Sequence, residues 1–253
     1  YLDWDIDLSS TFGRNKIDYY TNNSVNQSLG ADSPKDFYNG AHSFTHLVNN
    51  LDAVRVFKPA TVENLTLAFG IEQRLENFKT KAGAFASYGD GSPDVLDRIG
   101  SESFSGFKPE NAASNNRHNL GVYSEVNVDF TKRLLIGGAL RFEHYSDFGN
   151  NVSWKINARY LLPEKKGAIR ASINTGFRAP SLHQIYLSNI QTLQLADGTI
   201  GQQGTFNNAD PVIIDPIAGL GVPQLDAEES FNIAAGFTYK FTPRFTVSID
   251  YYN

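Results

Sequence analysis

The sequence predicts an all-β protein, an antiparallel up-and-down transmembrane β-barrel of which this chain holds about nine strands. Three observations support this: segments of ten or more residues alternate apolar with polar side chains, tight links alternate with long ones, and aromatic residues lie near segment ends. Side chains on a strand point to opposite faces in turn, and a membrane-crossing strand needs roughly 9 to 11 residues. We therefore expect one face in lipid and the other toward a wet lumen.

The first part of the chain contains three expected strands and two long loops. In the first strand, Leu2, Trp4, Ile6, Leu8 and Phe12 alternate with Asp3, Asp5, Asp7, Ser9 and Thr11. Residues 13–44 are rich in Asn, Ser, Asp and Gly without a sustained period, which predicts a loop. Strands are expected over roughly 45–57 and 62–77, and residues 79–117 form a second long polar segment.

Four consecutive segments between His118 and Pro180 alternate most clearly. Their apolar face carries residues such as Val122, Ile136, Ile156 and Ile173, and their polar face carries Tyr123, Arg141, Asn157 and Ser172. Near segment ends the apolar face carries Phe130, Phe142, Tyr160 and Phe177, as the aromatic girdles of an outer-membrane barrel require. This placement favours the membrane barrel over a soluble sandwich.

The order of long and short links predicts which strand ends lie together. The long segments are residues 13–44, 79–117 and 179–228, and the links at 58–61, 131–133, 163–166 and 242–244 are short. Outer-membrane barrels have short periplasmic turns on one rim and longer extracellular loops on the other. We therefore expect residues 1–253 to form part of one barrel domain, with the three long segments as extracellular loops.

Composition excludes several classes of function. The chain has no cysteine, which excludes disulfides and thiolate sites, and its net charge of −5 with a pI near 5.5 argues against nucleic acid as a partner. No apolar run reaches the roughly eighteen residues of a membrane helix. The chain starts without methionine and stops inside an alternating segment, so we expect it to be a fragment.

Two stretches resemble the barrel of TonB-dependent outer-membrane receptors. They are residues 145–149, Tyr-Ser-Asp-Phe-Gly, and residues 175–186, Thr-Gly-Phe-Arg-Ala-Pro-Ser-Leu-His-Gln-Ile-Tyr. Residues 68–74 and 228–252 also resemble strands of that family. The residues that carry the family motifs are Tyr145, Asp147, Phe148, Gly149, Gly176, Phe177, Arg178, Ala179 and Pro180.

The resemblance implies a function for the whole protein. It implies a twenty-two-stranded barrel in the Gram-negative outer membrane, closed by an N-terminal plug that this sequence does not contain. Such a receptor actively imports a scarce nutrient, an iron–siderophore, a vitamin or an oligosaccharide, with energy passed from the TonB–ExbB–ExbD complex. The expected partners are therefore outer-membrane lipid, that complex and a small ligand. Neither an enzyme activity nor a cofactor is expected.

Loops on a rigid barrel vary without disturbing the strands, so ligand specificity is expected in the three long segments. Aromatic and amide side chains there are candidate ligand contacts, with ordinary loop residues as the alternative: Tyr19, Tyr20, Tyr88, Tyr186, Gln191, Gln194, Gln202 and Gln203. His183 lies just after Pro180, and haem receptors of the resembled family carry a histidine in that loop, so His183 is a haem-ligand candidate. No other metal ligand is expected.

Two other functions stay open at this point. A passive porin or structural, adhesin-like barrel would show the same strands without a plug. A soluble β-rich ligand-binding module would place the apolar face inside. Arg178 falls on the polar face, where it could pair with a lumen carboxylate such as Glu143 or Asp147, or with a group of the plug.

Overall fold

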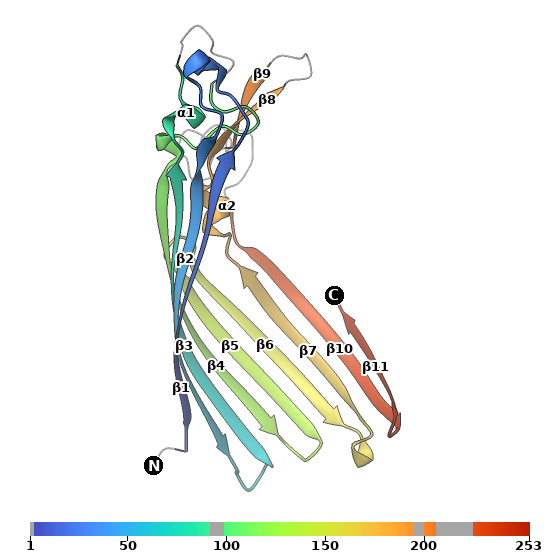
Figure 1. The fold of residues 1–253 in the computed structure, drawn as a ribbon. Coiled ribbons are helices and arrows are strands. Elements are labelled where there is room, and N and C mark those ends of the chain that lie inside the picture. The colour runs from blue at the N-terminus through green and yellow to red at the C-terminus, as the bar shows by residue number, and fades with distance from the viewer. Residues whose placement is uncertain (1–2, 92–98, 195–199, 206–224) are drawn as a thin grey trace, which may run out of the picture.

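Nine strands form a single antiparallel sheet in the computed structural model, in the order β1-β2-β3-β4-β5-β6-β7-β10-β11 (Figure 1). The structure describes all residues except 1–2, 92–98, 195–199 and 206–224, and it leaves out the side chains of residues 189–194 and 200–205. The strands of the sheet are β1 (Asp5–Thr21), β2 (Phe37–Phe57), β3 (Asn64–Ala82), β4 (Ala113–Asp129), β5 (Leu134–Tyr145), β6 (Gly149–Leu161), β7 (Gly167–Arg178), β10 (Glu228–Thr242) and β11 (Phe245–Tyr252). The predicted all-β, up-and-down architecture is confirmed.

Most of the remaining elements lie at the end of the sheet that carries the long links; the 3-10 turn between β6 and β7 lies at the opposite end. A separate hairpin consists of β8 (Asn189–Gln194) and β9 (Ile200–Thr205), and the two short α-helices are α1 (Phe85–Tyr88) and α2 (Leu182–Tyr186). Short 3-10 turns cover Gln27–Asp32, Pro109–Asn111 and Pro163–Lys165. Figure 1 shows β1, β2, β3 and β4 rising beyond the later strands toward α1 and this hairpin. None of the described helices is long and apolar enough to cross a membrane.

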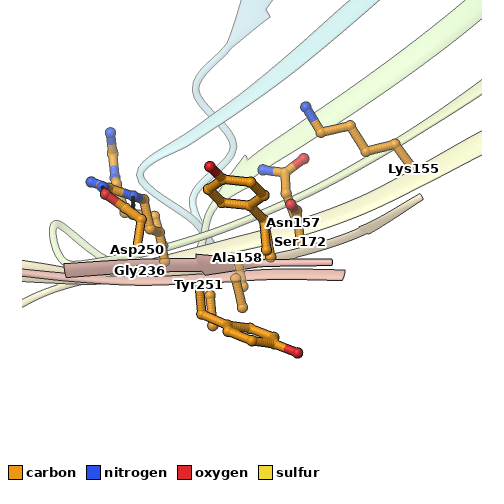
Figure 2. Close-up of a pocket in the computed structure, with 13 residues that line it drawn as sticks. Lys155, Asn157, Ala158, Ser172, Gly236, Asp250 and Tyr251 are labelled. Atoms are coloured by element: carbon orange, nitrogen blue, oxygen red, sulfur yellow. Dashed lines mark hydrogen bonds and ion pairs between the residues drawn. The ribbon is translucent and has the colours of Figure 1, made fainter. Parts of the chain in front are cut away.

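The sheet has an apolar outer face and a polar inner face. On the outer face one row of paired residues crosses the first five strands, in the order Leu8, Leu51, Ile71, Val122 and Phe142. Ile156 pairs with Ile173 in the same way further along the sheet. Figure 2 shows the two faces at β6 to β11, with Asp250, Asn157 and Lys155 on one side of the sheet and Tyr251 on the other. The register predicted for the central strands is therefore correct.

Aromatic rings gather on the outer face near the short-turn end. Trp4 lies 6.0 Å from Phe69 and 6.3 Å from Phe57 between ring centroids. At the other edge of the sheet, Tyr239 and Phe241 lie 4.7 Å apart. Rings at this level are what an outer-membrane barrel places at its lipid–water interface.

The strands beside the first two long loops extend further than the sequence indicates. Residues 13–21 belong to β1 and residues 37–44 to β2, so the expected loop over 13–44 shrinks to residues 22–36. In the same way β3 continues to Ala82 and β4 begins at Ala113, which shortens the expected loop over 79–117. The alternation is hidden there because the polarity of the two faces inverts: beyond Phe12 the outer face turns polar, and Ile17 and Tyr19 bring apolar surface to the inner face.

Buried polar groups join the first two loops into one body. The Asn26 amide donates to the carbonyl oxygens of Ala86 and Gly89 at 2.8 and 2.9 Å. Asn39 donates to the Ser101 hydroxyl at 2.9 Å. Buried polar side chains need such partners, and here the partners of Asn26 in the first loop and of Asn39 in β2 come from the second loop. These bonds therefore connect the described parts of the two loops above the sheet.

Candidate ligand site on the inner face

The inverted part of the sheet carries an aromatic cluster on its inner face. The His42 ring lies 5.4 Å from Tyr19, 5.5 Å from Phe78 and 4.6 Å from Phe107 between centroids. Strand pairing explains the cluster, because Phe44 pairs with Phe78 and Ile17 pairs with His42 on one face. These residues come from β1, β2 and β3, and Phe107 comes from the loop above them.

A cavity of about 300 Å³ opens beside this cluster. It is lined by Asn15, Ile17, Tyr19, His42, Ser43, Phe44, Phe78, Ser181 and His183. None of these side chains carries a carboxylate, an ammonium or a guanidinium group. The cavity therefore offers ring faces and a few neutral hydrogen-bonding groups, which is the usual lining of a small-molecule site.

His42 is held neutral within this site. Burial, with a smaller contribution from neighbouring His183, lowers the pKa of His42 from 6.5 to about 4. The residue lies beyond the apolar band of β2, and its Nδ1 is 3.3 Å from the Tyr19 hydroxyl. Its Nε2 is buried without a hydrogen-bond partner among the described residues. A neutral imidazole with one free nitrogen can accept or donate one further hydrogen bond.

Helix α2 brings His183 to the cavity. Ser181 caps the helix, since its hydroxyl accepts from the Gln184 N–H at 3.2 Å while the Gln184 side chain accepts from the Ser181 N–H at 2.8 Å. Leu182 is buried, and His183 lies 5.4 Å from Phe78 and 5.9 Å from His42. The described residues contain no group of three or more potential metal ligands. A haem-ligand role for His183 stays a prediction.

Arg117 joins the two sequence motifs beneath α2. Its guanidinium donates to both Asp147 oxygens, with the shortest distance 2.6 Å, and to the Pro180 carbonyl oxygen at 2.8 Å. It also lies over the rings of Phe148 and Tyr145, at 5.2 and 5.8 Å from their centroids. Sequence reasoning missed Arg117, because it stands at a strand start in an Asn-rich stretch. Strand pairing places Arg117 opposite Glu76 on the inner face. The one signal in the sequence was that Arg117 falls on the polar face when the alternation of its segment is continued toward the N-terminus.

The other motif residues lie close to this contact. The Arg178 guanidinium is exposed and lies 3.7 Å from the Glu228 carboxylate, while Glu143 and Asp147 are bonded to Arg141 and Arg117. Glu143 and Asp147 are therefore not the partners of Arg178 in this structure, because each is paired with another arginine. The Phe177 ring packs 5.6 Å from Tyr145, since pairing between β6 and β7 ends at Asn174 and leaves this part of β7 free of β6.

The structure separates the candidate ligand residues. Tyr19 lines the cavity, but a register shift follows it, and Tyr20 lies exposed with its ring 5.3 Å from Tyr38. Tyr88 packs on Phe85 in α1, and Tyr186 ends α2, so neither is among the cavity residues. Gln191 pairs with Gln203 across the β8–β9 hairpin, but the side chains of Gln191, Gln194, Gln202 and Gln203 lie outside the described part. Their roles stay predictions.

A sheet with an apolar outer face, aromatic rows near one rim and a polar inner face defines the wall of an outer-membrane β-barrel. The family model described as "TonB dependent receptor-like, beta-barrel" matches residues 1–253, so the chain belongs to that family. It is a Gram-negative outer-membrane family of transporters rather than enzymes.

Solved structures show the same fold. The siderophore receptor PirA from Acinetobacter baumannii matches with a TM-score of 0.60 and 16% identity, over 98% of this chain and 32% of the receptor. A mutant of the ferric enterobactin receptor PfeA from Pseudomonas aeruginosa matches with a TM-score of 0.58 and 15% identity, over 97% and 31%. The RagAB peptide importer matches with a TM-score of 0.53 and 15% identity, over 98% and 27%. The chain thus spans about a third of the length of these receptors. Among curated proteins, no sequence match is found.

Proposed function

We propose that this chain is the ligand-capturing wall of a TonB-dependent importer of an iron–siderophore chelate. The observation that carries the proposal is the uncharged aromatic cavity on the inner face, beyond the apolar band. The siderophore receptors with the same fold support this ligand class over a vitamin or an oligosaccharide. Energy reaches the barrel from the TonB–ExbB–ExbD complex through an N-terminal plug.

The cavity chemistry selects a planar, neutral part of the ligand. Ring faces of Phe44, Phe78 and Tyr19 stack against aromatic groups, which contributes about 0.5 to 1.5 kcal/mol per pair beyond the area buried. Neutral His42 adds one hydrogen bond. At about 300 Å³ the cavity is at the small end of ligand sites, so it holds one group of the chelate while the loops cover the rest.

Ligand titration of the full-length receptor tests the cavity. Phe44→Ala removes a ring from the cavity wall, and we expect the Kd for ferric siderophores to rise about tenfold from lost stacking and burial. Phe12→Ala is the matched control, because Phe12 is exposed on the outer face. Unchanged affinity in Phe44→Ala would contradict the role of the cavity.

Uptake by cells separates the importer from a passive barrel. In iron-starved cells the importer accumulates radiolabelled ferric siderophore only when TonB is present. A porin passes its solute at the same rate in cells that lack TonB, so equal uptake would favour the porin.

A further inference from the structure

Four polar side chains on the inner face of β6 and β7 have no partner in the described part of the chain. Lys155, Asn157 and Arg159 follow one another on the inner face of β6, and Ser172 of β7 pairs with Asn157. None of the four side chains forms a hydrogen bond or an ion pair with a described residue. Each of them carries at least one N–H or O–H donor. We call these four residues the donor cluster.

The donor cluster lines an open cavity of about 400 Å³. Figure 2 shows Lys155 and Asn157 on one side of the sheet, together with Asp250. The Arg170 guanidinium lies directly opposite Arg159 in the strand pairing and donates to the two Asp250 oxygens at 3.0 and 2.7 Å. Like charges opposite each other on neighbouring strands repel. Because Asp250 serves Arg170, a second anion beside Arg159 would offset this repulsion.

Arginines nearer the loops on the same face are matched by carboxylates of the chain. Arg141 lies 3.0 Å from Glu143, and Arg74 lies 3.0 Å from Glu72. The donor cluster has no such carboxylate among the described residues. Its positive charge is therefore available to a group from outside this part of the chain.

The inner face at the level of the donor cluster is acidic on the earlier strands. Lys155, Glu125 and Asp5 share one row of strand pairing across the sheet. Asp7 and Asp52 pair with each other in the next row toward the loops. An anion in this part of the lumen is repelled by the wall from β1 to β4 and attracted by β6, and charges placed in this way select ions in pores.

We propose that the donor cluster is a transit site for the anionic oxygens of the imported chelate, an inference that rests on the function proposed above. Arg159 pairs with Leu135, close to the short turn at 131–133, and the short turns face the periplasm. A ligand therefore meets the aromatic cavity at the loop end first and the donor cluster afterwards. Carboxylate oxygens accept charge-assisted hydrogen bonds from Lys155 and Arg159, and Asn157 and Ser172 add neutral donors.

Uptake by iron-starved cells that carry the full-length receptor tests the site. The two probes are a ferric siderophore with free carboxylates and its methyl ester, in which those carboxylates are uncharged. In the double variant Lys155→Gln, Arg159→Gln we expect about tenfold slower uptake of the free acid, because two charged partners are lost. Uptake of the ester and the Kd of the purified receptor for both probes should stay at wild-type values.

The matched control is Arg14→Gln, Lys79→Gln, which removes the same two charges from exposed positions on the outer face. This variant should import both probes at the wild-type rate. If the double variant in the donor cluster does not insert into the outer membrane, the single variants Lys155→Gln and Arg159→Gln take its place, with about threefold slower uptake of the free acid in each.

Four results would overturn the proposal. Uptake of the free acid at the wild-type rate shows that the donor cluster does not touch the ligand. Equal slowing of the acid and the ester shows that the cluster supports the plug or the fold instead. A rise in Kd that accounts for the slower uptake assigns the cluster to ligand capture. A wild-type receptor that imports neither probe overturns the proposed function itself, and the transit site with it.

Discussion

Arg117 is the residue that connects most of the site. Its side chain is 4% exposed, and it touches Asp147, the Pro180 carbonyl and two aromatic rings. A buried guanidinium is tolerable only when its donors are used, and here they hold two motifs that are far apart in sequence. Arg117 therefore connects the two motifs, which fixes the start of α2 and with it the position of His183.

Replacing Arg117 by alanine should remove this connection between the two motifs. We expect the full-length receptor to lose about 3 kcal/mol of unfolding free energy, because Asp147 is left without its cation in a partly buried place. Urea unfolding of the receptor in detergent measures the loss. Arg178→Ala is the control, since its pair with Glu228 is exposed and should contribute less than about 1 kcal/mol. Equal losses in the two variants would show that Arg117 has no special role.

His42 should make the loop end sensitive to acid. Its folded pKa near 4 lies below the ordinary 6.5, so between these values the folded protein binds fewer protons than the unfolded chain. Stability should therefore fall as the pH drops from about 6.5 toward 4, and His42→Gln should flatten that fall. Melting temperatures measured across this range check it. His118→Gln serves as a second reference variant. If the melting temperature of His42→Gln falls with pH as steeply as that of the wild type, the acid sensitivity comes from a group other than His42.

Glycines on the inner face let polar side chains of two strands bond to each other over the strand that lies between them. Gly70 on β3 lies between Asp52 on β2 and Tyr123 on β4, and the Tyr123 hydroxyl donates to Asp52 at 2.7 Å above it. Gly236 lies in the same way between Arg170 and Asp250. A Cβ at Gly70 would collide with both of its bridging neighbours. These glycines therefore serve close approach rather than turns.

Valine should be tolerated at one strand glycine and not at another. Gly70→Val displaces the bridge between Asp52 and Tyr123, and we expect a loss of about 1 to 3 kcal/mol. Gly138→Val is the matched change on the outer face, where the nearest atom to a new Cβ is the Lys155 carbonyl oxygen at 3.8 Å, and it should be nearly neutral. The unfolding free energies of the two variants test this prediction. A larger loss in Gly138→Val than in Gly70→Val would show that the inner and outer faces are misassigned.

Arginine scanning tests the faces of the sheet from the lipid side. Ile156→Arg puts a charge on the outer face and should cost about 2 to 4 kcal/mol near the bilayer midplane, whereas Asn157→Arg on the inner face should be mild. Folding yields into lipid vesicles compare the two. Similar costs at both positions would remove the case for a lipid-facing surface.

The sequence predicted the membrane part of each strand well and its extension poorly. Alternation identifies a strand only where one of its faces is apolar throughout. Val122 and Ile156 belong to such a face, within the apolar band. Beyond Phe12 the apolar side chains change faces, so residues 13–21 and 37–44 show no simple period. The cavity was missed for the same reason. Tyr19 was found by its chemistry, whereas His42, Phe44 and Phe78 become a group only through the pairing of β1, β2 and β3.

At the scale of the whole molecule, the inversion of the two faces divides the sheet into two zones. Within the membrane the outer face meets lipid and the inner face is wet. Beyond it, the inner face carries the aromatic cavity and the outer face carries Arg14 and Lys79. Asn26 connects the first loop to the second, and Asn39 connects β2 to the second loop, so ligand contacts rest on extended strands as well as on loops.

Loop exchange shows how ligand choice is divided between these parts. Replacing residues 181–228 of the full-length receptor by the matching segment of a receptor with a different known siderophore removes Ser181 and His183 from the cavity, while the wall from β1 to β3 remains. We expect the ligand preference to change and the retained wall to keep part of the original affinity, because loops vary on a rigid scaffold. Competition binding with both siderophores measures the change, and insertion into the outer membrane serves as the folding control. Unchanged preference after this exchange, and after exchange of residues 22–36 and 83–112, would locate specificity outside this part of the barrel.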